Sequence, residues 1–500
     1  MNHLSPEIRV PIEADNPSIT RVEGKCIQCG HCSRVCSNYL SVLNNYDLTK
    51  TGGKAICVNC GQCAVECPVD CIVEKIEYDK VREEIKNNDK IVIVSTAPSV
   101  RVSVGEMFGL PFGSFVEGKL VSLLRKLGFK YVLDVNFSAD LTIMEEAYEF
   151  VNRLNSGSLL PQFSSCCPSW VKFVELFYPE MRDNLSTCKS PIGMHGATIK
   201  TYYAKKMGLD PSKIVNVTIT PCTAKKMEIR REELNSSAKF NKIDGMRDND
   251  YIITAKELVE WAKKEKIDLN QLEDDKFDEF MGEASGAGVI FGNSGGVAEA
   301  AMRTAYKLIT KENPPKDIYE LKAVRGEDGI RTAEVVIGDK VVKVCVVYGL
   351  KNVRKVIQDI KDGVHYDFVE VMTCPHGCIG GAGQPKFLSQ SDKVHEERKK
   401  SLYNRDKELS NKVSCDNKEI LKLYKEFYGE QGSQLAEELL HTSYVDRSDN
   451  LDIMTGKKKY IKYYCKTCGA TFEVLDGTQA VCPMCLAEGD DLEIISERYA

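Results

Sequence analysis

The sequence lacks a segment suited to crossing a membrane and a segment suited to secretion. No run of about 18 apolar residues occurs, and residues 1–20 have neither the basic start nor the apolar stretch of a secretory signal. The 67 basic and 73 acidic residues nearly balance, so no basic surface is expected for nucleic acid or an anionic membrane. We therefore expect a cytoplasmic protein whose partners are small molecules or other proteins.

Cysteine, in contrast, is abundant, with 21 in 500 residues. Disulfide bonds do not account for them, because a reducing cytoplasm keeps thiols free, so metal clusters are the expected use. The cysteines fall into three groups, within 26–71, 166–378 and 465–485, and Cys415 stands apart. A chain of this length should form about three domains, so each group marks a candidate domain.

The first group is a doubled C-x-x-C-x-x-C-x-x-x-C motif, read as CIQCGHCSRVC and CVNCGQCAVECP. In this spacing three thiolates of one run bind one four-iron cluster and the fourth binds the other cluster. The expected ligand sets are Cys26, Cys29, Cys32 and Cys67, and Cys57, Cys60, Cys63 and Cys36. The segment resembles bacterial two-cluster ferredoxins. A pair of zinc knuckles explains the C-P ending poorly, and Cys71 is expected to be a small buried hydrophobe.

The last group consists of two C-x-x-C pairs separated by 13 residues, formed by Cys465, Cys468, Cys482 and Cys485. Four thiolates in this pattern make a tetrahedral site for one iron or one zinc. The knuckles resemble those of rubredoxin, which favours iron, although zinc ribbons look alike. The charged stretch before them has the polarity of a linker.

The middle of the chain alternates short β-rich runs with helical patterns. The runs cover residues 90–98, 131–137, 214–222, 343–349 and 368–375. Such alternation predicts an α/β domain of mostly parallel sheets with flanking helices, beside a small α+β ferredoxin-like domain and a small rubredoxin-like or zinc-ribbon-like β domain. The expected boundaries are 1–20 for an N-terminal extension, 21–85 for the ferredoxin-like domain, 86–445 for the catalytic domain, 446–459 for the linker and 460–500 for the last domain.

Two adjacent thiols precede a predicted helix in QFSSCCPSWVKFVELF. Pro168 suits the first helical position, so Cys166 and Cys167 should lie at the helix N-terminus, which lowers a thiol pKa. Two further loops carry cysteines after strands, and one is followed by glycines that allow close backbone approach. Another four-iron cluster would be completed by Cys167, Cys222, Cys374 and Cys378. Cys166 would then remain free. The alternatives are an ordinary C-P-x-G-C turn and, for the isolated Cys188, Cys345 and Cys415, structural thiols.

Three loops together resemble the signature segments of the FeFe-hydrogenases. They read SSCCPSW, TPCTAKKME and EVMTCPHGCIGGAGQP, and the resemblance extends over about residues 20–445. The resemblance implies the H-cluster fold and the H-cluster itself. That cofactor is a four-iron cluster joined through a cysteine, here Cys378, to a two-iron centre with carbon monoxide, cyanide and an aza-dithiolate bridge.

The same resemblance implies roles for the residues around that cofactor. Lys225 would donate a charge-assisted hydrogen bond to one cyanide, although alone it would be taken for a solvated lysine. Ala97, Pro98 and Ser99 would surround the other cyanide. Met372 would pack near the bridging carbonyl. The alternative is that Met372 and residues 97–99 only fill space in the core. Thr220, Ile192 and Ala382 depart from the commonest family pattern, which suggests a divergent subgroup with altered tuning of the cluster.

A proton relay is expected on one helix face. Glu146, Glu149 and Arg153 are spaced i, i+3 and i+7, although a solvated salt-bridge face would have the same spacing. The resemblance implies a relay that runs from Cys166 through Glu149, Ser186 and Glu146, with Arg153 at its mouth.

The expected function is that of a ferredoxin hydrogenase, which reversibly reduces protons to H2. Electrons would come from ferredoxin or a similar low-potential carrier through the accessory clusters, with the C-terminal site as a second entry point. Maturation proteins would deliver the two-iron part. The alternatives are a non-catalytic iron–sulfur assembly protein, whose relatives generally lack the full set of residues around the cofactor, and an H2 sensor, which is expected to carry a signalling module.

Overall fold

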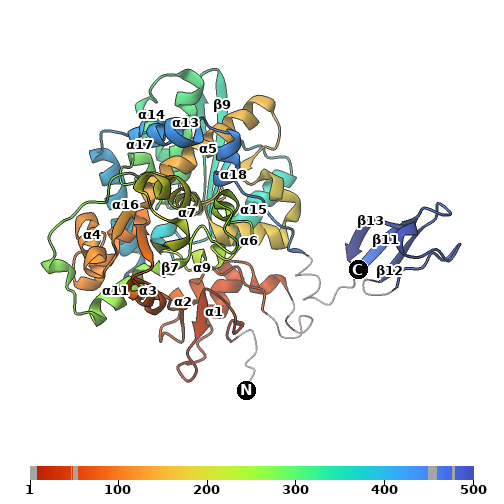
Figure 1. The fold of residues 1–500 in the computed structure, drawn as a ribbon, viewed down its shortest axis with the longest axis horizontal. Coiled ribbons are helices and arrows are strands. Elements are labelled where there is room, and N and C mark those ends of the chain that lie inside the picture. The colour runs from red at the N-terminus through yellow and green to blue at the C-terminus, as the bar shows by residue number, and fades with distance from the viewer. Residues whose placement is uncertain (1–7, 47, 49–54, 449–458, 476–478, 500) are drawn as a thin grey trace.

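The computed structural model describes residues 8–46, 48, 55–448, 459–475 and 479–499 (Figure 1). Within these ranges, no helix combines the length and the apolar character needed to span a membrane.

The first sheet of the large domain is entirely parallel. Its strands are β3 (Ile91–Thr96), β4 (Tyr131–Asp134), β6 (Ile214–Thr220) and β7 (Tyr251–Thr254), in the order β4-β3-β6-β7. The predicted strands near 90–98, 131–137 and 214–222 are confirmed, but the second ends early. Asp134 caps the next helix, because its side chain accepts a hydrogen bond from the backbone N–H of Asn136.

The second sheet is mixed. Its strands are β5 (Gln162–Phe163), β8 (Ile330–Ile337), β9 (Lys340–Tyr348) and β10 (Phe368–Met372), in the order β5-β10-β9-β8. The pairs β5–β10 and β10–β9 are parallel, whereas β8 and β9 form an antiparallel hairpin. The predicted runs at 343–349 and 368–375 are therefore strands, and β8 is an edge strand that the sequence did not indicate.

Helices fill the space between the sheets and cover their outer faces. One face of α5 (Val135–Ser156) packs with α13 (Gly296–Thr310) against the second sheet, and its other face packs near β3 and β4. The outer face of the first sheet is covered by α3 (Tyr78–Lys86), α4 (Glu117–Lys126) and α11 (Ala255–Lys264). The outer face of the second sheet is covered by α6 (Pro168–Phe177) and α15 (Leu350–Lys361). The α/β class with mostly parallel sheets is thereby confirmed.

The other helices complete the large domain. They are α7 (Pro191–Thr198), α8 (Ala204–Met207), α9 (Lys225–Glu228), α10 (Ser236–Asn241), α12 (Gly286–Ile290), α14 (Lys316–Tyr319), α16 (Ser391–Glu408), α17 (Lys418–Leu423) and α18 (Gln434–Leu440).

The N-terminal unit is a small α+β layer beside the large domain. Strands β1 (Ile19–Arg21) and β2 (Ile72–Glu74) pair antiparallel, and the short helices α1 (His31–Arg34) and α2 (Gln62–Val65) lie in the two cysteine runs. β1 starts two residues before the expected boundary at 21. The expected boundary at 85 also differs from the packing, because Tyr78 of α3 belongs to the core of the first sheet.

The C-terminal unit is a three-stranded antiparallel sheet, drawn to the right of the large domain in Figure 1. Its strands are β11 (Lys459–Cys465), β12 (Thr471–Leu475) and β13 (Leu492–Tyr499), in the order β12-β11-β13. The hydrogen bonds of the large domain extend to Arg447, whose backbone N–H and guanidinium both bond to Glu175. Residues 449–458 of the expected linker lie outside the described residues.

Candidate metal centre and proton relay

One cavity lies where the carboxyl ends of strands from both sheets meet. β3 leads into Pro98, β6 into Cys222 and β10 into Cys374, and this edge of a parallel sheet is the usual place for a site. The cavity brings together all ten residues expected around the H-cluster: Ala97, Pro98, Ser99, Cys166, Cys167, Cys222, Lys225, Met372, Cys374 and Cys378.

The cavity thiols face one another. Burial and then the neighbouring Cys167 raise the pKa of Cys222 to about 11. The pKa of Cys378 is raised by burial and then by Cys222 and Cys167. Burial and the same two sulfurs raise the pKa of Cys374. Several buried thiols that oppose each other's ionisation fit a site where bound metal supplies the positive charge.

Cys166 belongs to the same cavity but has different surroundings. Burial raises its pKa well above the ordinary value, and the adjacent Glu146 raises it further. The expectation that the N-terminus of α6 lowers this pKa was therefore wrong, because desolvation of the thiolate outweighs the helix dipole. A thiol that keeps its proton is suited to donating one.

Two polar groups of the lining fit a cofactor that presents hydrogen-bond acceptors. Ser99 is fully buried, and its Oγ has no hydrogen-bond partner among the described residues. Lys225 Nζ donates to the Cys166 carbonyl at 3.1 Å and lies 2.8 Å from the Glu228 carboxylate. An ammonium has three donors, so one proton stays available for a ligand. Without such a ligand the buried Ser99 hydroxyl would carry a desolvation cost.

The three departures from the family pattern occupy different places. Ile192 and Thr220 line the cavity. The Thr220 hydroxyl donates to the Cys222 carbonyl at 3.1 Å, which stabilises the loop that carries Cys222. Ala382 lies at the contact with the N-terminal unit, since a Cβ on Gly61 would meet its methyl group at 2.7 Å. The substitutions at 192 and 220 therefore face the cofactor cavity, and the one at 382 faces the accessory segment.

The relay residues follow α5 outward from the cavity. Ala139 of this helix lines the cavity. Both carboxylate oxygens of Glu146 are buried without a hydrogen-bond partner in the described part of the chain. Burial and the neighbouring Glu149 raise the pKa of Glu146 to about 8. Ser186 Oγ donates to Glu149 at 2.7 Å, and Arg153 lies 2.6 Å from the same carboxylate.

The order of the two glutamates differs from the expected one. Glu146, not Glu149, raises the pKa of Cys166, and Glu149 is the partner of Arg153. The arrangement is Cys166, Glu146, Ser186, Glu149 and Arg153. The reason is the direction of α5, whose first turns lie at the cavity, so that residues later in the helix lie farther from it.

Two threonines in the site were not singled out from the sequence. Thr373 Oγ1 lies 3.3 Å from the Cys167 sulfur. The backbone N–H of Thr187 donates to both oxygens of Glu149, and its hydroxyl lies 3.3 Å from one of them. Thr373 lies within the segment EVMTCPHGCIGGAGQP but was given no role there, and Thr187 belongs to no motif. Their only sequence signal was adjacency to Cys374 and to Ser186.

Cysteines of each accessory set lie near one another in the N-terminal unit. Cys26, Cys29, Cys32 and Cys67 line one small cavity. In the other set, burial and the neighbouring Cys57 raise the pKa of Cys36 to about 12. Burial raises the pKa of Cys60 and of Cys63, and in both cases Cys57 and Cys36 add to this effect. Backbone N–H groups donate to sulfur, from Asn59 to Cys57 at 3.3 Å and from Cys71 to Cys67 at 3.2 Å. Hydrogen bonds of this kind tune cluster potentials.

The second accessory set lies directly against the large cavity. Cys60 contributes to the raised pKa of Cys374. Thr223 Oγ1 donates to the Asn59 carbonyl at 3.2 Å, and Gln62 Nε2 donates to the Gly380 carbonyl at 3.1 Å. A cluster on this segment would therefore neighbour one in the large cavity.

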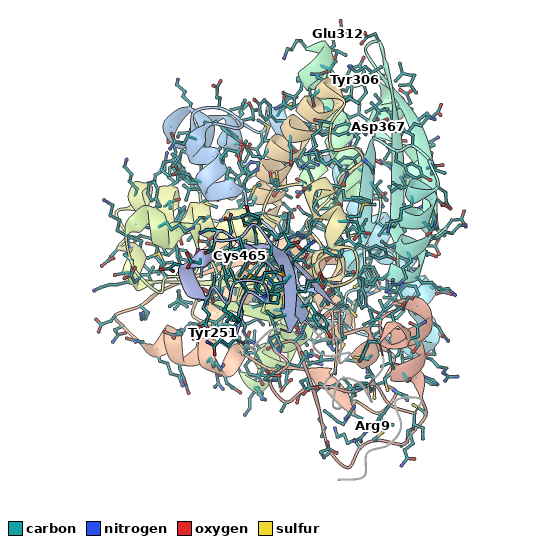
Figure 2. The ribbon with its side chains drawn as sticks, turned by 90° about the vertical axis from the view of Figure 1, so that its right-hand side faces the viewer. Arg9, Tyr251, Tyr306, Glu312, Asp367 and Cys465 are labelled. Atoms are coloured by element: carbon teal, nitrogen blue, oxygen red, sulfur yellow. The ribbon has the colours of Figure 1, made fainter. Side chains whose placement is uncertain are left out.

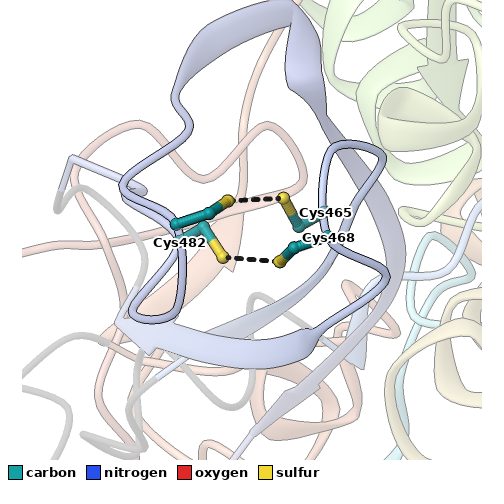
Figure 3. A group of neighbouring side chains, drawn as sticks. Cys465, Cys468 and Cys482 are labelled. Atoms are coloured by element: carbon teal, nitrogen blue, oxygen red, sulfur yellow. Dashed lines mark hydrogen bonds between the residues drawn. The ribbon is translucent and has the colours of Figure 1, made fainter.

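The C-terminal unit holds a separate candidate metal site, and Figure 2 shows Cys465 on this sheet. The sulfurs of Cys465, Cys468, Cys482 and Cys485 all lie within 4.8 Å of one another. Two sulfur pairs are 3.5 Å apart, one of them between Cys468 and Cys482 (Figure 3). This arrangement is that of a four-thiolate metal site.

Comparison with known proteins gives concordant results. The family model described as iron only hydrogenase large subunit, C-terminal domain, matches residues 90–382, and that of the iron hydrogenase small subunit matches residues 392–447. NADP-reducing hydrogenase subunit HndD of Solidesulfovibrio fructosivorans is 41% identical over 86% of this chain and 75% of its own. Iron hydrogenase 1 of Clostridium pasteurianum is 40% identical over 87% of this chain and 77% of its own.

More distant relatives include the cytosolic Fe-S cluster assembly factor narfl of Danio rerio, which is 31% identical over 72% of this chain and 88% of its own. Among solved structures, an apo variant of FeFe-hydrogenase HydA1 from Chlamydomonas reinhardtii is 36% identical, with a TM-score of 0.64 over 74% of this chain and 98% of that chain. The chain therefore belongs to the iron-only, or FeFe, hydrogenase family.

Proposed function

We propose that this protein is a cytoplasmic ferredoxin hydrogenase that reversibly converts two protons and two electrons into H2. The observation that carries the proposal is the free thiol of Cys166. It lies in the cavity of the four candidate ligand cysteines and next to a buried carboxyl group that leads outward. A site that only stored or transferred a cluster would need the four ligands but not this thiol and carboxyl.

The proposed cofactor is an H-cluster held by Cys167, Cys222, Cys374 and Cys378, with Cys378 as the bridging ligand. When bound, it supplies the redox and hydrogen chemistry of the reaction. Lys225 Nζ and Ser99 Oγ would orient it through hydrogen bonds, and Ala97, Pro98 and Met372 would exclude water. Cys166 Sγ would pass a proton to the cofactor side of the cavity and regain one from Glu146.

The raised pKa of Glu146 gives a test that is independent of turnover. The pKa of this carboxyl is about 8 in the folded state and near 4.5 in the unfolded chain. Between these two pH values the carboxyl is therefore neutral in the folded protein but charged in the unfolded chain. Its contribution to stability should therefore fall as pH rises from about 4.5 to 8.

The glutamine side chain of Glu146→Gln is neutral at every pH. The free energy of unfolding of this variant, taken relative to that of the wild type, should therefore be at least about 1 kcal/mol higher at pH 8 than at pH 5. Thermal unfolding of both proteins at the two pH values measures the difference. Glu438→Gln, an exposed glutamate on α18, serves as the control and should show no such trend. An equal stability difference at both pH values would contradict the raised pKa.

Electrons would reach the H-cluster through two accessory four-iron clusters on the N-terminal unit, supplied by ferredoxin or a similar low-potential carrier. The C-terminal four-cysteine site, proposed to bind iron, would be a second entry point. Maturation proteins would deliver the two-iron part.

Truncation after Ser448 tests the role of the C-terminal unit, since it keeps the contact between Arg447 and Glu175. H2 evolution driven by reduced methyl viologen should be unchanged, because a small dye can donate directly to the remaining clusters. The truncated protein should also contain one iron atom fewer per chain. A loss of one zinc instead would show a structural zinc site, and a loss of dye-linked activity would show that the unit is needed for the catalytic domain.

A second candidate function is iron–sulfur cluster assembly without catalysis, which the similarity to the Danio rerio assembly factor favours. The two functions are separated by loading the anaerobic protein with the two-iron cofactor and measuring H2 evolution from reduced viologen. The hydrogenase should evolve H2 at a sustained rate, an assembly protein should evolve none, and a sensor only a trace. Infrared bands of carbon monoxide and cyanide in the loaded protein would establish the cofactor itself.

A further inference from the structure

The outer carboxylate of the relay, Glu149, has few partners with which it can exchange a proton. The Arg153 guanidinium lies 2.6 Å away, but arginine stays protonated in proteins and cannot relay a proton. The same guanidinium is also bonded to backbone carbonyls, including that of Leu185 at 3.0 Å. Ser186 lies on the inner side of Glu149, near Glu146, whose pKa it lowers. Among the polar contacts that the described residues make with Glu149, the Cys188 sulfur lies 3.9 Å away but is buried. The hydroxyl of Thr187 connects Glu149 to a further titratable side chain on the outer side.

That side chain is His441, which follows α18. Its Nδ1 lies 2.7 Å from Thr187 Oγ1, and its Nε2 lies 3.2 Å from a carboxylate oxygen of the fully buried Glu145. Glu145 is itself fixed, because it accepts hydrogen bonds from the Tyr424 hydroxyl and from the Gly432 backbone N–H at 3.0 Å. The imidazole is therefore held with Nδ1 directed at the relay.

The surroundings of His441 favour its protonated form. Burial lowers its pKa, but the hydrogen bond to Glu145 and the charges of Glu145, Glu437 and Glu149 outweigh burial and leave the pKa raised. Glu437 lies 3.8 Å from Nδ1, and its side chain is 55% exposed, whereas that of His441 is 7% exposed. These three carboxylates are the charged groups that face the imidazole from α5 and α18.

We propose that His441 reloads Glu149 with protons through the Thr187 hydroxyl, with Glu437 as the collecting group at the surface. This inference rests on the proposed function. His441 Nδ1–H donates to Thr187 Oγ1 while the hydroxyl proton of Thr187 passes to the Glu149 carboxylate. His441 is then neutral and regains a proton at Nδ1 from solvent by way of Glu437. The distance of 3.8 Å exceeds a hydrogen bond, so this transfer requires the exposed Glu437 side chain to move closer to Nδ1.

In H2 oxidation each step is reversed, and Glu149 releases its proton along the same groups. No electrons move in these steps, and each proton taken up at Glu437 corresponds to one delivered at Glu149. As pH rises through the pKa of His441 the donor is lost, so H2 evolution should decline in that range.

The test compares two variants that interrupt the proposed proton path with a control variant of another histidine. His441→Gln and Thr187→Val should each lower viologen-driven H2 evolution by about tenfold or more at neutral pH. A positioned proton donor typically contributes a hundredfold or more. The expected loss is smaller here because Glu149 is itself partly exposed and can take up some protons from solvent. Both should also flatten the decline with rising pH. His365→Gln removes an exposed histidine whose Nε2 lies 2.9 Å from Asp367 and should match the wild type. All proteins are compared at equal iron content and equal intensity of the cofactor infrared bands.

A second pair separates proton collection from structural support. Glu437→Gln should slow H2 evolution at low buffer concentration and recover at high concentration, because buffer molecules then deliver protons to His441 directly. Glu438→Gln, its neighbour on α18, should show no such buffer dependence.

The outcomes are distinguishable. An inactive but loaded wild type would overturn the proposed function itself. An active wild type with unchanged rate and pH profile in His441→Gln would overturn this inference alone. Loss of activity in His441→Gln with full activity in Thr187→Val would also overturn it, because the histidine would then act only as a structural support.

Discussion

Serine in place of Cys166 should leave the iron content of the protein near normal and lower H2 turnover by at least about a hundredfold. The iron should remain because Cys166 is the fifth sulfur of a cavity that offers four other candidate ligands. Turnover should fall because a hydroxyl is a far weaker acid than a thiol and would hold its proton in the same dry surroundings. Iron analysis and viologen-driven H2 evolution on one anaerobic preparation measure both quantities.

Cys415→Ser is the matched control for this variant. Cys415 is partly buried and lies outside the cavity, and burial and the neighbouring Asp416 raise its pKa to about 11. The control should keep both iron and turnover. Normal turnover in Cys166→Ser would contradict the relay role, and loss of about four iron atoms would mean that Cys166 is a ligand in place of one of the other four.

The cluster-binding loops could be predicted from the sequence because their information is local. Thiols at fixed short spacing can reach one metal centre only in a few ways, and strands such as β3 and β6 show their character in runs rich in β-branched residues. The cavity also followed from a general rule, since three of its loops leave the carboxyl ends of strands.

The order of the relay could not be predicted from spacing. The i, i+3 positions place Glu146 and Glu149 on one face of α5 but say nothing about which end of the helix meets the cavity. The same limit applied to the pKa of Cys166, which depends on burial by segments distant in sequence. Strand β8 was missed because its residues mix Arg331, Glu334 and apolar side chains, as suits an edge strand with one exposed face.

His441 illustrates the limit most clearly. It lies 254 residues after Thr187 and outside the three groups of cysteines, and only the fold brings the two side chains within hydrogen-bond distance. A histidine without a spaced motif is ordinarily assigned to no function. The contact exists because residues 392–447 pack against α5 and α7 rather than forming a separate unit.

Methionine in place of Arg303 should destabilise the catalytic domain by about 3 to 5 kcal/mol, the usual effect of breaking a buried ion pair. Arg303 on α13 is fully buried, and its guanidinium lies 2.8 Å from Asp406 of α16 and also contacts Glu299. It further donates to the Lys412 carbonyl at 3.0 Å. Without it the Asp406 carboxylate is left buried, whereas Glu299 keeps Arg325 as a partner at 2.6 Å. Thermal or denaturant unfolding of the iron-loaded protein measures the loss.

Arg405→Met is the control, since Arg405 is one-third exposed and pairs with Glu408 at 3.3 Å, so its loss should cost less than about 1 kcal/mol. Adding Asp406→Leu to Arg303→Met should recover part of the stability, because an apolar pair replaces a lone buried charge. Equal free energies of unfolding for Arg303→Met and Arg405→Met would contradict this account. The expected result has a functional consequence: Arg303 belongs to the segment matched to the large subunit and Asp406 to that matched to the small subunit, so this ion pair helps to hold the His441 segment against the relay.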